Sequence, residues 1–260
     1  LKFACDFNFL VVAQWSIRKN VENTIRWFVE EFKDEEVGLV LKINTVNNST
    51  KDRYRTEAKI KELLQPYADR KCKIQLLHGF MTDQEMTTLY NHSQIKALIS
   101  LAHGEGFGLP IFEAAYNGLP IIAPNWSGHV DFLYAPVKDK KKKKMVNKAL
   151  FSRVGYTLQP MQEQARWDGV LIEDSMWCYP EERSCKQRLR SVFKSLSRHR
   201  STAKKLKAHI LKSNAQEKQY AAFVKSILGE LPKSINVGDL PKVSIITSVY
   251  DGDEFIRPFL

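Results

Sequence analysis

Two short stretches combine residues that bind anions with residues that bind hydroxylated ligands. The first is Q-W-S-I-R-K-N (14–20), in which Arg18 and Lys19 are adjacent. A guanidinium binds two oxygens at once and an ammonium acts as a point charge, so the pair suits a diphosphate. The stretch lacks the glycine fingerprints of dinucleotide-binding and P-loop sites. On this stretch alone, a solvated pair of surface cations is an equally good explanation.

The second stretch is H-G-E-G-F-G-L-P-I-F-E (103–113), in which Glu105 and Glu113 are eight residues apart. Gly106 and Gly108 allow the backbone to approach a ligand closely and to direct amides at an anion. Carboxylates beside a phosphate are unfavourable unless they accept hydrogen bonds from hydroxyl groups, which a sugar supplies. The two stretches together therefore predict a sugar-nucleotide site. The alternative is that Glu105 is a loop charge and Glu113 a surface residue.

Alternating strands and helices position both stretches. Short apolar runs predict five strands, at residues 7–13, 37–43, 73–77, 95–100 and 120–123, and the first, a continuous apolar run, is expected to be buried on both faces. Segments with helical periodicity separate them, which is typical of a parallel sheet wrapped by helices. The sequence thus predicts an α/β fold with a Rossmann-like, doubly wound parallel sheet. The two stretches follow the first and fourth strands, and such sheets bind ligands at the carboxyl ends of their strands.

Local signals mark the ends of several helices. Asn20 is expected to cap the first helix, and Thr82 with Glu85 forms a capping box at the start of another. Pro110 lies in the first turn of the helix that follows the second stretch, and Gly118 lies just past its end. Both stretches therefore lead into helix N-termini, where backbone amides favour an anion.

The chain after the fifth strand is less regular. Residues 134–169 are interpreted as an insertion or extended loop. Helices resume near Pro180, and extra C-terminal helices with two apolar stripes complete a domain that spans residues 1–228. The stripes are Leu189, Val192, Phe193 and Leu196, and Tyr220, Phe223, Val224, Ile227 and Leu228. Residues 229–242, with two prolines and two glycines, are interpreted as a linker, and residues 243–260 as the start of another domain.

The net charge of +11 on 260 residues is concentrated in two segments. Residues 183–212 hold 11 basic residues and no acidic one, and residues 138–148 hold seven lysines against Asp139. A protein that is basic throughout is therefore excluded. The two segments also suit a nucleic-acid or anionic-membrane binding module without catalysis, the rival function, although no recognition motif accompanies them.

Composition excludes other classes of protein. With 43% hydrophobic residues the chain can bury a full core, which excludes a disordered protein. No apolar run approaches the ~20 residues of a membrane span, and the first residues lack a signal-peptide pattern. The four cysteines show no metal-binding spacing and are expected to be reduced thiols. We therefore expect a cytoplasmic protein, with a membrane-peripheral location compatible with its basic segments.

These residues resemble a known family. The segments FLVVAQWSIRKN, HGEGFGLPIFEAAYNGLPIIAP and SGHVDF are similar to the C-terminal, donor-binding domain of the group 1 (family four) retaining glycosyltransferases of GT-B architecture. The resemblance covers about residues 5–228. It implies a nucleoside-diphosphate sugar, such as a UDP- or GDP-sugar, as the donor substrate. It also implies no cofactor and no metal.

The resemblance implies roles for the charged residues. Arg18 and Lys19 would hold the donor diphosphate, and Glu105 would meet the donor sugar, so that these three form the catalytic group. Glu113 would bind the ribose hydroxyls. Transfer would retain the anomeric configuration, with the leaving phosphate assisting the incoming hydroxyl.

The resemblance extends to backbone contacts. The phosphate and sugar would lie against the backbone of Gly106, Phe107, Gly108 and Leu109. The base would lie against the backbone near His78 and Gly79, at the end of the third strand. His103 would touch the donor sugar or phosphate, although a loop histidine with satisfied hydrogen bonds is as good an explanation.

Two departures from the family pattern define the expected partners. The acceptor-binding N-terminal domain of the family precedes the first strand seen here, so this chain alone is expected to bind the donor without transferring it. The acceptor would be a glycan or a lipid-linked molecule, with no nucleic acid involved. PKVSIITSVYDGDEFIRPFL (241–260) resembles the opening of a family two, GT-A glycosyltransferase domain. Asp251 and Asp253 in that segment are given no role.

Three further residues are weaker candidates. His129 and Asp131 follow the fifth strand and line the same crevice on one interpretation, while a helix cap explains Asp131 equally well. Trp177 suits stacking on a base, but core packing is the better explanation.

Overall fold

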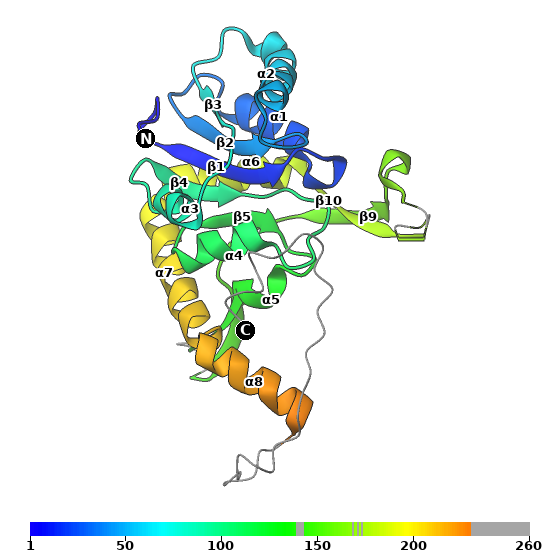
Figure 1. Cartoon of the computed structure of the whole chain (residues 1–260). Coiled ribbons are helices and arrows are strands. Elements are labelled where there is room, and N and C mark those ends of the chain that lie inside the picture. The colour runs from blue at the N-terminus through cyan, green and yellow to red at the C-terminus, as the bar shows by residue number, and fades with distance from the viewer. Residues whose placement is uncertain (139–142, 168, 171, 173, 230–260) are drawn as a thin grey trace. The chain divides into compact units, whose positions relative to one another are not determined.

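The computed structural model describes residues 1–138, 143–167, 169, 170, 172 and 174–229 (Figure 1). The chain divides into two compact units, Leu1–Asn214 and Ala215–Leu260. The predicted GT-A-like segment at 243–260 and residues 230–242 of the predicted linker lie outside the described residues.

A six-stranded parallel sheet forms the centre of the first unit, in the order β3-β2-β1-β4-β5-β8. The strands are β1 (Asn8–Gln14), β2 (Gly38–Asn44), β3 (Lys73–Leu77), β4 (Ile95–Ile99), β5 (Ile121–Pro124) and β8 (Ser152–Val154). The order reverses between β1 and β4, and this reversal defines the doubly wound architecture predicted from the sequence. The loops after β1 and β4 therefore meet at the switch point of the sheet.

Helices cover both faces of this sheet. They are α1 (Val21–Phe32), α2 (Thr50–Leu64), α3 (Asp83–Tyr90), α4 (Leu109–Tyr116), α5 (Val130–Leu133), α6 (Glu182–Lys194) and α7 (Leu196–Ser213). Short 3-10 turns are η1 (Ile17–Lys19), η2 (Gln65–Tyr67) and η3 (Glu163–Ala165). The capping box of Thr82 and Glu85 is present at α3, as predicted. Pro110 lies in the first turn of α4.

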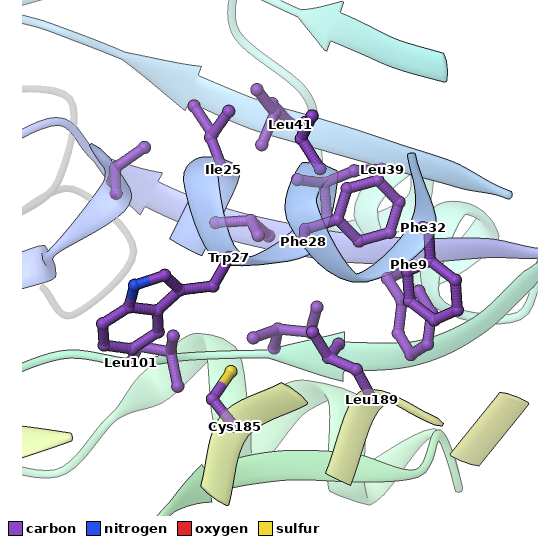
Figure 2. Close-up of a cluster of buried hydrophobic side chains, with 14 of the residues drawn as sticks. Phe9, Ile25, Trp27, Phe28, Phe32, Leu39, Leu41, Leu101, Cys185 and Leu189 are labelled. Atoms are coloured by element: carbon purple, nitrogen blue, oxygen red, sulfur yellow. The ribbon is translucent and has the colours of Figure 1, made fainter. Parts of the chain in front are cut away.

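Two apolar clusters lie on opposite faces of the sheet. Successive residues of one strand alternate between them, because side chains along a strand point to opposite faces. Phe9 and Val11 belong to the cluster with α1, α2 and α6, whereas Leu10 belongs to the cluster with α3, α4, α5 and α7. Figure 2 shows the first cluster, in which Phe9, Phe28 and Phe32 pack beneath Leu39 and Leu41.

Helix α6 is attached to α1 by charge as well as by apolar packing. Arg190 forms ion pairs with Glu31 and Glu35 and lies over the ring of Phe32. Lys186 pairs with Glu30 at 2.6 Å. Two cations of the basic segment 183–212 are thus used inside the fold, so this segment is only partly a free basic surface.

The region 134–169, expected to be an insertion or extended loop, contains strands that the periodicity missed. β6 (Tyr134–Lys138) and β7 (Met145–Ala149) form an antiparallel hairpin. β8 extends the central sheet beside β5. β9 (Tyr156–Pro160) pairs with β10 (Met176–Pro180), and Trp177 in β10 is buried. The sheet therefore has one strand more than the five predicted.

The described part of the second unit is α8 (Gln216–Leu228) and Gly229. Tyr220, Phe223 and Ile227, which are part of the predicted stripe, are exposed. None of the helices in the described residues is long and apolar enough to cross a membrane.

Candidate functional site

Arg18, Lys19 and Glu105 meet at the switch point of the sheet, at the strand ends where the sequence predicted a sugar-nucleotide site. The Lys19 ammonium donates to Glu105 Oε1 at 2.5 Å, and Arg18 Nη1 donates to Glu105 Oε2 at 3.1 Å. Arg18 Nη1 also donates to the carbonyl of Gly104 at 2.6 Å. The Glu105 side chain is 8% exposed, Lys19 14% and Arg18 41%. One nearly buried carboxylate thus bridges two cations, the more accessible of which is Arg18.

Backbone contacts fix the loop that carries the two cations. The residues form η1, and the carbonyl of Arg18 accepts a hydrogen bond from the amide of His103 at 2.8 Å. Asn20 follows in the left-handed region with φ 51°, and its side-chain amide donates to the carbonyl of Leu101. The prediction that Asn20 caps α1 was correct for its position and wrong for its bond, because its side chain makes no cap hydrogen bond. Asn20 instead joins the β1 and β4 loops.

The Glu105 backbone is held by Ser127 and Gly128, which follow β5 and were given no role of their own in the sequence-based prediction. The hydroxyl of Ser127 accepts from the Glu105 amide at 2.8 Å and donates to the Glu105 carbonyl at 2.5 Å. The Gly128 amide donates to the same carbonyl at 3.0 Å. A Cβ at Gly128 would lie 1.7 Å from the carbonyl oxygen of Gly106, so only glycine fits. The sole sequence signal was the S-G-H run.

The predicted backbone cradle follows Glu105 directly. Gly108 has φ 84° and precedes α4, a conformation that glycine adopts without strain. In the described part of the chain, the amides of the cradle have no hydrogen-bond partner; these are Gly106, Phe107, Gly108 and Leu109. The Phe107 ring packs against Phe112 and Phe132. The cradle can therefore accept an anion without breaking a bond.

Glu113 lies on α4 and has a different neighbour from Glu105. Its Oε2 accepts from the Tyr90 hydroxyl of α3 at 2.8 Å. Burial and the adjacent carboxylate raise the pKa of Tyr90, so the hydroxyl stays protonated as a donor. Both residues line a cavity of about 280 Å³ between α3 and α4. Glu113 is thus oriented by a tyrosine that the sequence argument did not connect to it.

His103 is buried behind the cation loop. Its Nδ1 lies 2.6 Å from the carbonyl of Cys178, so Nδ1 carries the proton that is donated. Its ring stacks on Trp177 with an interplanar angle of 10°. Burial lowers the pKa of His103, and the hydrogen bond to Cys178 only partly opposes this. The imidazole is therefore neutral near neutral pH. The buried position of Trp177 agrees with core packing.

His129 is buried close to Glu105. Its Nε2 is 2.8 Å from the carbonyl of Pro124, which leaves the buried Nδ1 without a hydrogen-bond partner among the described residues. Its Cβ is close to Gly108, where an added Cβ would come within 3.1 Å. Burial lowers the pKa of His129 most strongly, while the nearby Glu105 raises it and Lys19 lowers it. His129 thus supports the cradle as a neutral, buried side chain.

His78 and Gly79 follow β3, at the edge of the sheet. His78 Nε2 is 2.9 Å from Oδ2 of Asp52, and both side chains are 3% exposed. Burial alone would raise the pKa of Asp52, but hydrogen bonds from His78 and from the amides of Thr45 and Val46 lower it overall.

The backbone after His78 is fixed in the same way. Gly79 has φ 110°, and Lys42 donates to its carbonyl. The end of β3 is therefore a rigid backbone platform. Asp52 organises this platform from the first turn of α2 and was not predicted from the sequence as a site residue.

Metal and thiol chemistry has few candidate groups here. No group of three or more His, Cys, Asp or Glu side chains in the described residues could hold a metal ion. Cys5, Cys72, Cys178 and Cys185 are free and buried, and burial raises the pKa of each thiol. Arg18, Lys19 and the amides of the cradle are therefore the groups at this site that can neutralise an anionic ligand.

Sequence comparison places this geometry in a family. The family model for glycosyl transferases group 1 matches residues 6–136, just over half of the chain and the part that carries every residue named in this site except Cys5, Trp177, Cys178 and Cys185. The chain belongs to the group 1 glycosyltransferase family. No curated protein sequence matches this group 1 chain.

Solved structures share the fold. The chain is similar to the C-terminal domain of a group 1 glycosyl transferase from Francisella tularensis, with TM-score 0.50 and 11% identity over 81% of this chain and 87% of that one. It is similar to sucrose-phosphate synthase from Thermosynechococcus elongatus (TM-score 0.54, 15% identity, 85% and 45% covered). It is also similar to HepE from Anabaena, solved in complex with UDP and glucose (0.53, 13%, 85% and 48%).

These similarities show the fold of the group 1 chain. At such identities they concern the fold alone. The chain spans most of an isolated C-terminal domain but less than half the length of the other two chains. The α/β fold is thus that of a GT-B C-terminal domain, as the resemblance implied.

Proposed function

We propose that this chain is the donor-binding half of a retaining glycosyltransferase and binds a nucleoside-diphosphate sugar at the switch point of its sheet. The observation that carries the proposal is the bridge from Glu105 to Arg18 and Lys19. Two cations with one carboxylate leave a net positive site beside four free backbone amides. A diphosphate supplies the missing negative charge, and a sugar supplies hydroxyl groups for the carboxylate.

The proposed roles follow the positions of the side chains. Lys19 and Arg18 bind the diphosphate, and the amides of the cradle, Gly106 to Leu109, bind its oxygens and the sugar. Glu105 accepts hydrogen bonds from the donor sugar once the diphosphate occupies the cations. Glu113 accepts from the ribose hydroxyls, with Tyr90 holding its second oxygen in place.

The base is proposed to lie against the rigid platform at the end of β3. His78 and Gly79 offer backbone there, because Asp52 holds the imidazole and Lys42 holds the Gly79 carbonyl. His103 acts as the wall behind the cation loop. Its ring supports the site by packing, since Nδ1 is already bonded to Cys178.

The proposed reaction breaks the bond between the sugar and the diphosphate and forms a bond from the anomeric carbon to an acceptor hydroxyl. The proton of that hydroxyl passes to a leaving phosphate oxygen, on the face that the phosphate leaves. Arg18 and Lys19 stabilise the negative charge that develops on the diphosphate. This chemistry is proposed to be metal-independent and to retain the anomeric configuration.

The acceptor is proposed to bind in an N-terminal domain that precedes the donor-binding domain. The family neighbours that extend over more than twice the matched length provide room for such a domain. We propose a glycan or lipid-linked acceptor, hexosyl transfer as the reaction class, and a cytoplasmic, membrane-peripheral location. On this proposal the chain alone binds the donor without transferring it.

A thermal-shift screen tests the proposal. UDP-, GDP- and ADP-sugars are added separately, and the ligand that binds the native state raises its stability by RT ln(1 + [L]/Kd). We expect one base to raise Tm, and the rise to be lost in Lys19→Ala. Lys51→Ala, which removes an exposed lysine from α2, is the matched control and should keep the rise. No shift with any sugar nucleotide would refute the donor site.

A further inference from the structure

A second cavity lies at the amino ends of the strands, whereas the donor site lies at their carboxyl ends. It has a volume of about 520 Å³, within the range of small-molecule sites. Its lining includes Ile121 and Ser152, the first residues of β5 and β8. The donor-site loops follow the other ends of parallel strands. The two sites therefore lie at different edges of the sheet, and no residue named in the donor site lines this cavity.

The charged side chains that line the cavity are all basic. Arg153 comes from β8, Arg188 from α6, Arg198 from the first turn of α7 and Lys148 from β7. No aspartate or glutamate in the described part of the chain lines it. The three arginines come from three separate elements and repel one another, and the cost of that repulsion falls when an anion binds among them.

Polar contacts orient the groups at the base of the cavity. Arg188 Nε donates to the carbonyl of Arg153 at 2.8 Å, which fixes the position of its guanidinium. The half-buried His199 lies between two hydroxyls, with Nδ1 3.2 Å from Ser152 Oγ and Nε2 3.1 Å from Ser191 Oγ. Burial, then Arg198 and Arg188, lower the pKa of His199, which agrees with the positive charge around it.

We propose that this cavity binds a phosphate group, carried by a soluble phosphoester or by a lipid headgroup. One guanidinium group can bind two phosphate oxygens, and three guanidinium groups line this cavity. A neutral imidazole has one N–H and one acceptor nitrogen, so one of the two serine hydroxyls bonded to His199 donates to it and the other keeps its proton for a ligand. The site is independent of the donor-binding function, because it is built from residues on other elements and at the other sheet edge.

Calorimetric titration of the full chain with inorganic pyrophosphate tests the site. The Lys19→Ala background weakens the donor site, so that binding elsewhere is measured. Arg153→Gln with Arg198→Gln should raise Kd at least about tenfold, a loss of about 1.4 kcal/mol. Both side chains are exposed, and the Arg153 carbonyl that Arg188 uses is unchanged by the substitution. Thermal unfolding of each variant checks that it folds.

The matched control removes the same charge from the same surface. Lys204→Gln with Lys205→Gln lies on α7 outside the cavity and should leave Kd within about twofold. Equal weakening in both double variants would mean unspecific attraction and overturn the proposal. Failure of the donor-site screen leaves this result untouched, since the background already lacks Lys19.

A vesicle arm identifies the source of the phosphate. Phosphatidylcholine vesicles with and without phosphatidic acid are sedimented with the wild-type chain and with both double variants. Retention that needs phosphatidic acid and is lost only in Arg153→Gln with Arg198→Gln assigns the site to a lipid headgroup. Pyrophosphate binding without vesicle retention assigns it to a soluble phosphoester. Absence of both overturns the proposal.

Discussion

Replacement of Glu105 by glutamine separates the two ligand groups that the donor site is proposed to bind. In the structure the carboxylate bridges Lys19 at 2.5 Å and Arg18 at 3.1 Å. A diphosphate that binds these cations must share them with the carboxylate. The glutamine side chain keeps the size of glutamate and removes its charge, so the cations become fully available to the phosphate.

The magnitude follows from the charges. Two unit negative charges about 5 Å apart repel by about 3 kcal/mol at an effective dielectric constant of about 20, an upper value before salt and reorientation reduce it. We therefore expect the bare nucleoside diphosphate to bind about three- to tenfold more tightly to Glu105→Gln. The sugar nucleotide gains the same term but loses a hydrogen bond from a sugar hydroxyl to a charged acceptor, which contributes about 1.5–3 kcal/mol. The Kd of the sugar nucleotide divided by the Kd of the bare diphosphate should thus rise about 10- to 100-fold.

Calorimetric titration of Glu105→Gln with the nucleoside diphosphate and with its sugar nucleotide measures this ratio. Glu113→Gln is the matched control, because the ribose is common to both ligands and the ratio should not change. Arg18 and Lys19 stay intact in both variants. An unchanged ratio in Glu105→Gln would remove the carboxylate from the sugar site. Weaker binding of the bare diphosphate would refute the competition between carboxylate and phosphate.

Two further predictions concern stability. Gly128→Ala places a Cβ 1.7 Å from the Gly106 carbonyl oxygen and should lower the free energy of unfolding, measured by chemical denaturation, by roughly 1–3 kcal/mol. Gly106→Ala, with no atom within 4 Å of its added Cβ, should lower it by less than about 1 kcal/mol. Equal losses in the two variants would contradict the steric argument. Burial lowers the pKa of His103 and His129 in the folded state, so as the pH falls these histidines bind protons in the unfolded chain before they do so in the folded one. Stability should therefore fall as the pH drops below about 6.5. Denaturation from pH 7.5 to 5 should show the advantage of wild type over His103→Gln shrinking by up to about 1.4 kcal/mol per pH unit, and a constant difference would contradict a neutral buried His103.

The elements predicted best from the sequence are those specified by local signals. The third strand was predicted over 73–77 and is Lys73–Leu77, because a short segment rich in apolar residues lies between the helix stop at Pro66 and the turn at Gly79. The capping box at α3 was predicted from two residues, since both of its hydrogen bonds join residues three apart. β8 was missed because a three-residue strand is too short for any periodicity. Its place in the sheet depends on pairing with β5, from which it is far in sequence.

In the candidate site, the functional residues were predicted from the sequence, but the residues that position them were not. The types of Arg18, Lys19 and Glu105 and the fold class together predicted that they would meet, since the carboxyl ends of neighbouring parallel strands share one edge. The partners that position them were not predictable from spacing. Ser127 reaches Glu105 from a segment 22 residues later, and Tyr90 reaches Glu113 from another helix. These bonds depend on how loops and helices pack across the sheet, which no local pattern encodes.

The distribution of charge separates the chemistry of the donor site from the net charge of the chain. The donor site uses two cations, and one of them is already neutralised by Glu105 in the absence of ligand. Within the segment 183–212, Lys186 and Arg190 serve to attach α6 to α1, whereas Arg188 and Arg198 line the second cavity. Among the described residues, Arg188 and Arg198 therefore differ from Lys186 and Arg190, because the latter two form ion pairs with carboxylates of α1 and the former two do not. A ligand that responds to the excess charge should bind in the second cavity, and its affinity should depend on salt more steeply than that of the donor, whose site holds a compensating carboxylate.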